Sequence, residues 1–492
     1  MEKRNICLIN DSFPPAIDGV ANAVTNYARI ISSELGKCTV VTPYYPEADD
    51  SVFDFPVVRY PSVDMTKLVG YRAGMPFSAE LLGRLEAEKF DLIHSHCPIT
   101  STMVARSLRD RIRVPVVFTY HTKFDIDIAN AVRSKVLQEE AARLLVANIA
   151  ACDEVWTVSN GAGENLRKLG YQGEWSVMPN GVDFPRGRVD EALIRRVTEG
   201  FDLPEGVPVF LFVGRMMWYK GIRIILDALK LLRDEGREFR MVFVGGGGDK
   251  DEIVKYTQSL GLDGTVLFSE PIRDRERIRA WYCRADLFLF PSTFDTNGLV
   301  VREAAACALA SVLVAGSCAA EDVLDGESGF LIEENAASMA AKLRTLLASP
   351  EAMARVGEGA QREIYVSWQE AVHRAYERYG VVIENYRLGR YPTHDSFSDD
   401  FFHGMARTMD ALNRRKEVQI QVRTAVRERS ELLQKGLSER GEQLQRELNE
   451  RGEQLQRELT ERGEELRDEV LAEGRKLHSA LEDFYRYYDR FL

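Results

Sequence analysis

Residues 290–316 read FPSTFDTNGLVVREAAACALASVLVAG. The segment starts in one apolar stretch, ADLFLFPS at 285–292, and ends in another, ASVLVAG at 310–316, with a helical pattern from about residue 298 between them. Two such stretches joined by a crossover helix are typical of parallel strands in one sheet. The segment therefore predicts a parallel sheet with helices on both of its faces.

The same alternation extends in both directions from this segment and restarts once along the chain. The predicted strands of the first half are 5–10, 37–44, 55–61, 91–96, 115–122 and 154–160, and those of the second half are 207–214, 239–248, 264–270, 285–292 and 310–316. We therefore expect an α/β protein with two Rossmann-like, doubly wound domains, residues 1–184 and 185–366. Ligands bind such sheets at the carboxyl ends of the strands, so two facing domains surround one cleft.

The composition of the 492-residue chain excludes several classes of protein. Apolar residues make up 45% and charged residues 28%, which is ordinary for a globular protein. The 64 basic and 76 acidic side chains give a net charge of −12, which disfavours a general nucleic-acid binder. Neither a signal-peptide core nor a transmembrane helix is predicted. We expect a cytoplasmic protein, with at most a peripheral contact at the inner membrane face.

Metal and disulfide chemistry are also disfavoured. The seven cysteines are dispersed and form no CxxC pair, which favours reduced thiols. His94 and His96 lack the cysteine or carboxylate pattern that would complete a metal site, so we expect no metal and no cofactor. The glycine run at 245–248 is not followed by the third glycine of a dinucleotide fingerprint, and no Walker-type sequence is present. A dehydrogenase and a P-loop ATPase are therefore disfavoured.

The end of the chain has a different character. Its last 100 residues contain no proline, and a period of eleven residues runs through 428–482. Eleven residues make about three helical turns, so each repeat presents nearly the same face, where Gly441, Leu444 and Leu448 are followed by their equivalents. Glycine inside a helix costs about 1 kcal/mol relative to alanine, so its repetition favours close approach of a second helix.

We predict that residues 391–492 form a helical extension, a long helix or coiled coil, that joins copies of the chain into a homo-oligomer. The alternatives are a lone solvated helix and a membrane or partner contact through the aromatic end FYRYYDRFL at 484–492. If the extension makes the oligomer, truncation after Pro392 should change the molecular size before it changes catalysis.

The segment quoted first also carries the strongest chemical signal. Asp295 and Glu303 lie eight residues apart, and Asn297, Gly298 and Leu299 stand between the strand end and the helix. A helix N-terminus offers N–H groups to phosphates, and carboxylates accept hydrogen bonds from ribose and sugar hydroxyls. Taken alone, Asp295 could be only a helix N-cap and Glu303 only a surface residue.

Two further segments supply groups for a diphosphate. FVGRMMWYKG ends a predicted strand and places Arg215 and Lys220 just ahead of a helix, where two cations suit a diphosphate. Gly19 precedes a helix after the first strand, where the missing side chain lets a phosphate approach the backbone. The simpler alternatives are two solvated surface charges and an ordinary turn glycine. The combination with Asp295 and Glu303 favours a site for a sugar nucleotide.

Residues 1–388 resemble the retaining glycosyltransferases of family 4, whose two Rossmann-like domains make the GT-B fold. The matching segments are FPPAIDGV at 13–20, DLIHSHCP at 91–98, TYHTKFD at 119–125, ACDEVWTVSNG at 151–161, MPNGVD at 178–183, FVGRMMWYKG at 212–221, VGGGGD at 244–249, residues 268–292 and Asp295-x7-Glu303. SWQEAVHRAYERY at 367–379 resembles the helix that crosses back to the first domain in this family, which implies a crossover helix over 367–390.

The resemblance implies a role for each matching residue. Arg215 and Lys220 would neutralise the diphosphate, Asp295 would face the donor sugar, and His121 would touch the donor sugar or the acceptor. These four residues form the implied catalytic set. The implied donor-binding set consists of Gly19 at the phosphates, Pro271 and Ile272 near the nucleobase, Asn297, Gly298 and Leu299 through their N–H groups, and Glu303 at the ribose.

One departure from the family pattern concerns the sugar. Aspartate stands at 295 in place of the usual glutamate, which shortens the reach of the carboxylate by one methylene and leaves the identity of the sugar open. The resemblance implies transfer from a nucleoside-diphosphate sugar, with a UDP-sugar favoured over GDP or ADP donors, to a lipid or glycan acceptor. The alternatives are an oligomeric scaffold with a degenerate sugar-nucleotide cleft and another GT-B enzyme such as a sugar-nucleotide epimerase.

Overall fold

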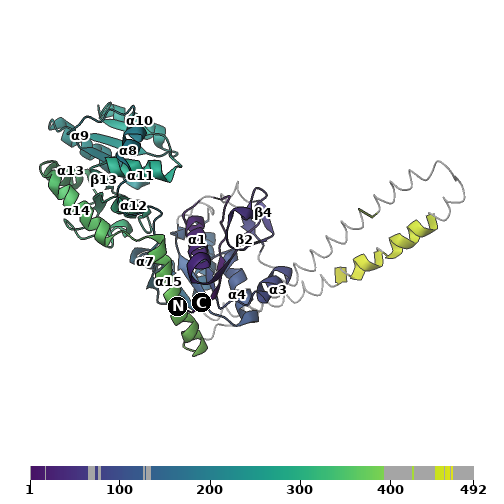
Figure 1. Ribbon diagram of the computed structural model, residues 1–492. Helices are drawn as coiled ribbons and strands as arrows, with labels where there is room; N and C mark the ends of the chain where they lie inside the picture. Colours follow the sequence, from purple (N-terminus) through teal and green to yellow (C-terminus); the bar gives the residue numbers. More distant parts are fainter. Residues whose placement is uncertain are drawn as a thin grey trace.

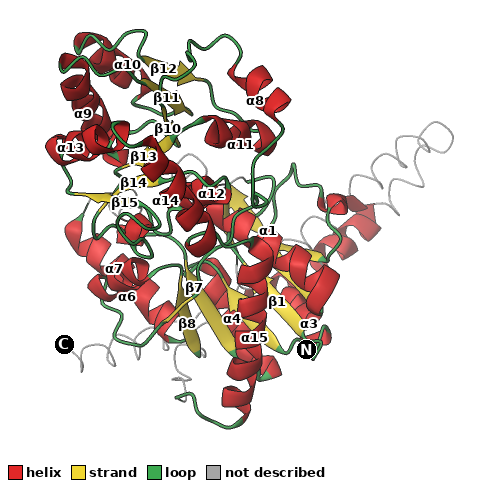
Figure 2. Cartoon of the chain, turned by 60° about the vertical axis from the view of Figure 1, so that its left-hand side comes forward, coloured by secondary structure: helices red, strands yellow, loops and turns green. Residues whose placement is uncertain are grey.

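Two parallel sheets form the body of the protein, and each is covered by helices (Figures 1 and 2). The computed structural model describes residues 2–16, 18–64, 72–75, 79–125, 128, 134–392, 424–425, 449–458, 460–465 and 467–468. The predicted α/β architecture with two Rossmann-like units is confirmed. In Figure 1 the two units appear as separate lobes, with the N-terminal sheet and its helices in purple and blue.

The first sheet has the strand order β3-β2-β1-β6-β7-β8-β9, and its paired strands are all parallel. Its strands are β1 Asn5–Ile9, β2 Lys37–Pro43, β3 Val57–Tyr60, β6 Leu92–Ser95, β7 Val116–Tyr120, β8 Glu154–Thr157 and β9 Ser176–Val177. Its helices are α1 Gly19–Ile30, α3 Ala79–Ala87, α4 Thr100–Ile112, α6 Lys135–Ala150 and α7 Asn160–Lys168. A short antiparallel pair, β4 Ser62–Asp64 and β5 Arg72–Gly74, lies beside it.

The second sheet has the order β12-β11-β10-β13-β14-β15 and is also parallel throughout. Its strands are β10 Val209–Val213, β11 Arg240–Val244, β12 Val266–Ser269, β13 Leu287–Phe290, β14 Ser311–Val314 and β15 Phe330–Ile332. Its helices are α8 Glu191–Thr198, α9 Ile222–Asp234, α10 Lys250–Ser259, α11 Arg275–Arg284, α12 Leu299–Ala306, α13 Ala336–Leu347 and α14 Pro350–Glu363.

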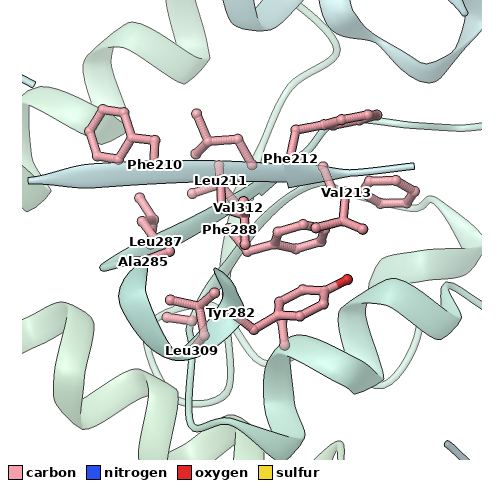
Figure 3. Close-up of a cluster of buried hydrophobic side chains, with 14 of the residues drawn as sticks. Phe210, Leu211, Phe212, Val213, Tyr282, Ala285, Leu287, Phe288, Leu309 and Val312 are labelled. Atoms are coloured by element: carbon pink, nitrogen blue, oxygen red, sulfur yellow. The ribbon is translucent and has the colours of Figure 1, made fainter. Parts of the chain in front are cut away.

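The core of the second sheet explains why its strands are almost continuously apolar. In β10, Phe210 and Phe212 lie on one face of the strand, and Leu211 and Val213 lie on the other (Figure 3). All four side chains are buried, because helices cover both faces. Tyr282 of α11 belongs to the same hydrophobic core and is also fully buried.

The last helix of the body, α15 Trp368–Arg387, returns to the first sheet (Figures 1 and 2). It begins with a capping box in which the Ser367 hydroxyl accepts a hydrogen bond from the backbone of Glu370 and the Glu370 carboxylate accepts from that of Ser367. Tyr376 and Tyr379 are fully buried in the core that also holds Ile6 and Leu8 of β1. Thus the chain enters the second unit and comes back to the first.

Only part of the C-terminal extension is described. Residues 449–458, 460–465 and 467–468 are helical, and Arg457 forms an i,i+4 ion pair of 3.6 Å with Glu453. Among the described residues beyond 392, Leu455 and Gly463 are half-buried and the others are exposed. Both belong to the predicted repeat face. The rest of the repeat region and the aromatic end at 484–492 lie outside the described residues.

Candidate functional site

A cavity of about 1230 Å³ lies between the carboxyl ends of the two sheets. In the first sheet the strand order reverses between β1 and β6, and in the second it reverses between β10 and β13. The loops that follow these four strands line the cavity. Such switch points are where open parallel sheets bind ligands, because the loops diverge there and leave a crevice. The cavity is thus placed where two facing α/β units hold a shared substrate.

The cavity brings together eight of the eleven residues expected from the sequence. Those that line it are Gly19, His121, Arg215, Lys220, Asp295, Asn297, Gly298 and Leu299. The other three, Pro271, Ile272 and Glu303, are not among its lining residues. Pro271 lies against the glycine turn after β11, where a Cβ on Gly246 would come within 2.9 Å of its ring, and Ile272 packs half-buried against the core of the second sheet.

Lys220 and Asp295 both line the cavity, and they form an ion pair. The Lys220 ammonium donates to both carboxylate oxygens of Asp295, at 2.8 and 2.9 Å, and the Ser292 hydroxyl donates to the same carboxylate at 2.6 Å. The side chain of Lys220 is only 9% exposed, while that of Asp295 is 22% exposed. The sequence assigned these two residues to different parts of the donor, whereas the structure makes them direct partners.

Arg215 remains available as a second cation. It lies two residues after the end of β10, its side chain is exposed, and it has no ion-pair partner among the described residues. A guanidinium presents several donors in a fixed fork that matches phosphate oxygens. Arg215 is therefore free to meet an anion that enters the cavity, while Lys220 is already engaged by Asp295.

The loop between β13 and α12 binds the two units together as well as lining the cavity. Asn297 is buried, and its amide donates at 2.7 Å to the carbonyl of Val158 in the first unit. Ser159 donates at 2.6 Å to the carbonyl of Thr296. Gly298 begins α12 with φ 59° and ψ 46°, a left-handed conformation that glycine adopts readily. This turn aims the N-terminus of α12 at the cavity, where its free N–H groups suit a phosphate.

Two contacts across the cleft were missed from the sequence. Glu321, to which no role was assigned, accepts hydrogen bonds from the backbone of Asn160 and Gly161, at 2.6 and 3.2 Å, at the start of α7. An acidic residue at a helix N-terminus is favourable, but the contact joins segments 160 residues apart. Lys123 donates at 3.3 Å to the carbonyl of Thr293. No local pattern predicts either contact.

At the start of α1, the backbone N–H groups that follow Gly19 are not free to bind a phosphate. Asp18 caps this helix, and its carboxylate accepts hydrogen bonds from the N–H groups of Val20 and Ala21, at 2.8 and 2.7 Å. These N–H groups are therefore occupied by a negative side chain that also lines the cavity. A phosphate that approaches Gly19 meets open space beside its Cα. Aspartate before a helix is a strong N-cap signal, so this contact could have been predicted.

His121 directly follows β7 and is the least buried of three neighbouring buried histidines. One ring nitrogen of His121 lies 2.9 Å from His96, while its Nδ1 has no partner among the described residues. His94 completes the row, with Tyr379 of α15 at 2.6 Å and Thr119 at 2.7 Å from its two nitrogens. Burial lowers the pKa of His121 to about 3, so the ring is neutral at ordinary pH.

This row predicts sensitivity to acid. Burial lowers the pKa of His94 and His96 well below the ordinary value of about 6.5. Below about pH 6.5 the unfolded chain binds more protons than the folded one, so stability falls as the pH falls towards the folded values. Each histidine should remove up to about 1.4 kcal/mol per pH unit below about pH 6. Urea unfolding at pH 7 and pH 5 measures this loss.

The variant His121→Gln supplies the control for the acid sensitivity. Glutamine keeps hydrogen-bonding groups but does not titrate, so this variant should lose about a third of the pH dependence of the free energy of unfolding. Equal unfolding free energies at pH 7 and pH 5 in the unaltered chain would contradict the burial of neutral histidines.

Comparison with known proteins gives the family. The model described as "Glycosyltransferase Family 4" matches residues 17–186, and that described as "Glycosyl transferases group 1" matches residues 195–363. A D-inositol 3-phosphate glycosyltransferase of Nocardia farcinica is 30% identical over 339 residues, which cover 64% of this chain and 72% of that protein. The chain belongs to glycosyltransferase family 4. It is therefore an enzyme, a hexosyltransferase.

A more distant relative and two solved structures of similar fold are also found. An alpha-monoglucosyldiacylglycerol synthase of Streptococcus pneumoniae is 22% identical over 308 residues, covering 61% of this chain and 69% of that protein. A sucrose-phosphate synthase from Thermosynechococcus elongatus has a similar fold, with a TM-score of 0.61, 21% identity and coverage of 78% of this chain and 100% of that one. Anabaena HepE in complex with UDP gives a TM-score of 0.62 at 18% identity, covering 77% and 100%. The GT-B fold expected from the sequence is confirmed.

Proposed function

We propose that this family 4 enzyme is a retaining glycosyltransferase that moves a hexosyl group from a nucleoside-diphosphate sugar to a lipid acceptor. Residues 185–366 hold the donor, and residues 1–184 receive the acceptor. The observation that carries the proposal is that Arg215, Lys220 and Leu299 at the N-terminus of α12 line one cavity together with His121. Two cations and a helix N-terminus suit a leaving diphosphate, whose negative charge grows during transfer.

The chemistry follows from what surrounds the reacting carbon. When the bond from the anomeric carbon to the diphosphate breaks, Arg215 and Lys220 stabilise the oxygen that leaves. The acceptor hydroxyl then attacks from the same face and gives its proton to that phosphate oxygen, so the configuration is retained. Asp295 is a poor candidate for a covalent nucleophile, because its carboxylate already receives hydrogen bonds from Lys220 and Ser292. The neutral His121 is left to orient a sugar or acceptor hydroxyl.

A UDP-sugar is the favoured donor. The structurally similar HepE is described in complex with UDP, and its fold matches 77% of this chain. The test is release of nucleoside diphosphate from UDP-, GDP- and ADP-sugars by the purified chain, followed by the anomeric configuration of the product. Conversion of the donor into an epimeric sugar without an acceptor would favour an epimerase, and no turnover would favour a scaffold with a degenerate cleft.

The acceptor end of the cavity favours a lipid over a glycan. Besides polar residues, the first unit contributes a group of large apolar side chains to the lining, namely Ile99, Met103, Phe124, Ile128, Leu144 and Leu145. On α6 the side chains of Val136, Leu137 and Leu144 are 59–67% exposed, so an apolar strip extends from the cavity to the surface. An amphipathic acceptor could rest its apolar part on this strip while its hydroxyl reaches the donor. The similar Streptococcus protein is named for synthesis on a diacylglycerol.

Basic residues of the first unit, among them Arg106 and Arg133, are a candidate set for contact with an anionic membrane surface, but Arg106 does not fit this role. Arg106 is 4% exposed and donates at 2.8 Å to Asn148 inside the first unit, so it cannot meet a lipid headgroup. Arg133 lies outside the described residues. Peripheral contact at the inner membrane face is therefore proposed through the apolar strip on α6. Among the described residues, no helix is both long and apolar enough to cross a membrane.

Leu144→Glu should separate acceptor use from donor use. A charge at this position opposes the binding of an acyl chain, so transfer to diacylglycerol in vesicles should fall about tenfold while donor hydrolysis without acceptor stays unchanged. Val52→Glu is the matched control, because Val52 is 68% exposed but does not line the cavity. Equal losses in both variants, or no loss with Leu144→Glu, would contradict the proposed acceptor surface.

The homo-oligomer also stays a proposal, through the C-terminal helical extension with its eleven-residue repeat. The repeat face supports it, and two of its residues, Leu455 and Gly463, lie in the helical part that the structure describes. Light scattering on the full chain and on a chain truncated after Pro392 tests this role, and the same size in both would contradict it.

A further inference from the structure

Glu303 is held from both sides by one neighbouring helix. Arg275 donates to one carboxylate oxygen at 2.5 Å, and the Tyr282 hydroxyl donates to the other at 3.0 Å. Both donors belong to α11, and Glu303 lies on α12. The side chain of Glu303 is 10% exposed. The carboxylate expected at the ribose is therefore set in one orientation before any ligand arrives.

Arg275 also contacts the segment that joins the two units. Its guanidinium stacks on the ring of Phe184 at 4.5 Å and lies 3.9 Å from the carboxylate of Asp183. Asp183 in turn accepts hydrogen bonds from Asn22 and Asn26 of α1, at 3.4 and 3.3 Å. The guanidinium thus stands between two carboxylates, one from each side of the junction. Arg275 therefore has partners within the protein, so its position does not depend on a bound phosphate.

The surroundings of Arg275 and Tyr282 keep both side chains in their protonated forms. Burial works against the charge of Arg275, but the nearby Glu303 carboxylate and its hydrogen bond outweigh burial and raise the pKa of Arg275. Burial, reinforced by Glu303, raises the pKa of Tyr282 well above its usual value. Arg275 therefore stays a cation and Tyr282 a neutral donor. A carboxylate accepts about four hydrogen bonds, so two acceptor positions on Glu303 remain for a ligand.

We propose that Arg275 is a positioning residue: with Tyr282 it fixes Glu303 so that the remaining carboxylate lone pairs accept the ribose hydroxyls of a nucleoside diphosphate. The inference rests on the proposed function and on the ribose role that the family resemblance implies for Glu303. It adds that ribose recognition depends on a residue of α11 that is itself anchored, through Asp183, to α1. Loss of Arg275 should leave Glu303 present but free to rotate.

The test measures how well the full-length chain distinguishes UDP from 2′-deoxy-UDP by calorimetry. The unaltered chain should bind UDP roughly tenfold more tightly than the deoxy compound, because a hydroxyl that pairs with a buried carboxylate is lost. Arg275→Ala should remove most of this preference and raise the donor KM with little change in kcat. Arg275→Lys should keep part of the preference. Arg277→Ala is the matched control, an exposed arginine on the same helix.

The outcomes separate this inference from the proposed function. A normal preference for UDP in Arg275→Ala overturns the inference, and so does equal weakening of both nucleotides, which would indicate a phosphate contact. In a Glu303→Gln background, Arg275→Ala should have no further effect on the preference, and an additional effect also overturns it. If the alanine variant does not fold, as judged by its thermal transition, Arg275→Lys and Arg275→Gln decide by the same ratio.

A different pattern would reject the proposed function itself. If the unaltered chain binds none of UDP, GDP and ADP, the cavity is not a nucleotide-sugar site. The proposed role of Arg275 is then rejected as well. If it prefers GDP or ADP, the matching ribose and deoxyribose pair replaces UDP in the same comparison, with the same expected loss of preference in Arg275→Ala.

Discussion

Lys220→Ala should reduce sugar transfer by roughly 10²–10³-fold in kcat while leaving the chain folded. Lys220 lines the cavity, and its side chain is only 9% exposed. Its charge therefore acts on the leaving diphosphate with little screening by water. Its removal also leaves the Asp295 carboxylate with Ser292 but without its cation, next to the place proposed for the phosphates. A negative charge then replaces a neutral pair at the point where negative charge develops.

The measurement is nucleoside-diphosphate release under saturating donor, with the thermal transition as the check on folding. Lys250→Ala is the control, because Lys250 forms an ion pair with Glu270 on the outside of the same unit. The double variant Lys220→Ala, Asp295→Ala should recover part of the loss, since it removes the unpaired carboxylate as well. Full activity in Lys220→Ala would reject the site.

The sequence predicted the architecture well because the relevant signals are local. Apolar runs such as VFLFV at 209–213 are continuous since both faces of a parallel strand are covered, and the structure buries all five side chains. Arg215 and Asn297 reach the cavity because each lies in the loop after a strand that ends at a switch point. Residues at strand ends can therefore be placed from the sequence as soon as the strands are found.

The contacts inside the site were harder to predict from the sequence than the architecture, because they join segments that are distant along the chain. Lys220 and Asp295 are 75 residues apart, and their pairing depends on the separation of two loops that no periodicity fixes. Arg275 and Glu303 meet only because α11 and α12 pack together, so the family resemblance implied a ribose contact for Glu303 but no role for Arg275. The Asp18 cap was different, since aspartate before a helix is a local signal that could have been used.

Gly221→Ala should destabilise the second unit by roughly 3 kcal/mol, because the substitution adds a steric clash to backbone strain. Gly221 begins α9 with φ 77°, a left-handed conformation that costs about 1–2 kcal/mol for alanine. A Cβ at this position would lie 2.4 Å from the carbonyl oxygen of Pro291, which is backbone and cannot turn aside. The neighbouring Lys220 would be displaced with it, so transfer should fall even in the folded fraction.

Gly236→Ala separates the two causes, since Gly236 ends the same helix at nearly the same φ, 74°, with no atom within 4 Å of an added Cβ. This variant should lose only the conformational part, about 1–2 kcal/mol, and keep full transfer activity. Urea unfolding gives the free energies, and nucleoside-diphosphate release gives the activity. Equal destabilisation of the two variants would show that the Pro291 backbone moves away at little cost. In that case the turn that presents Lys220 is adaptable, and its tight packing does not explain the position of the cation.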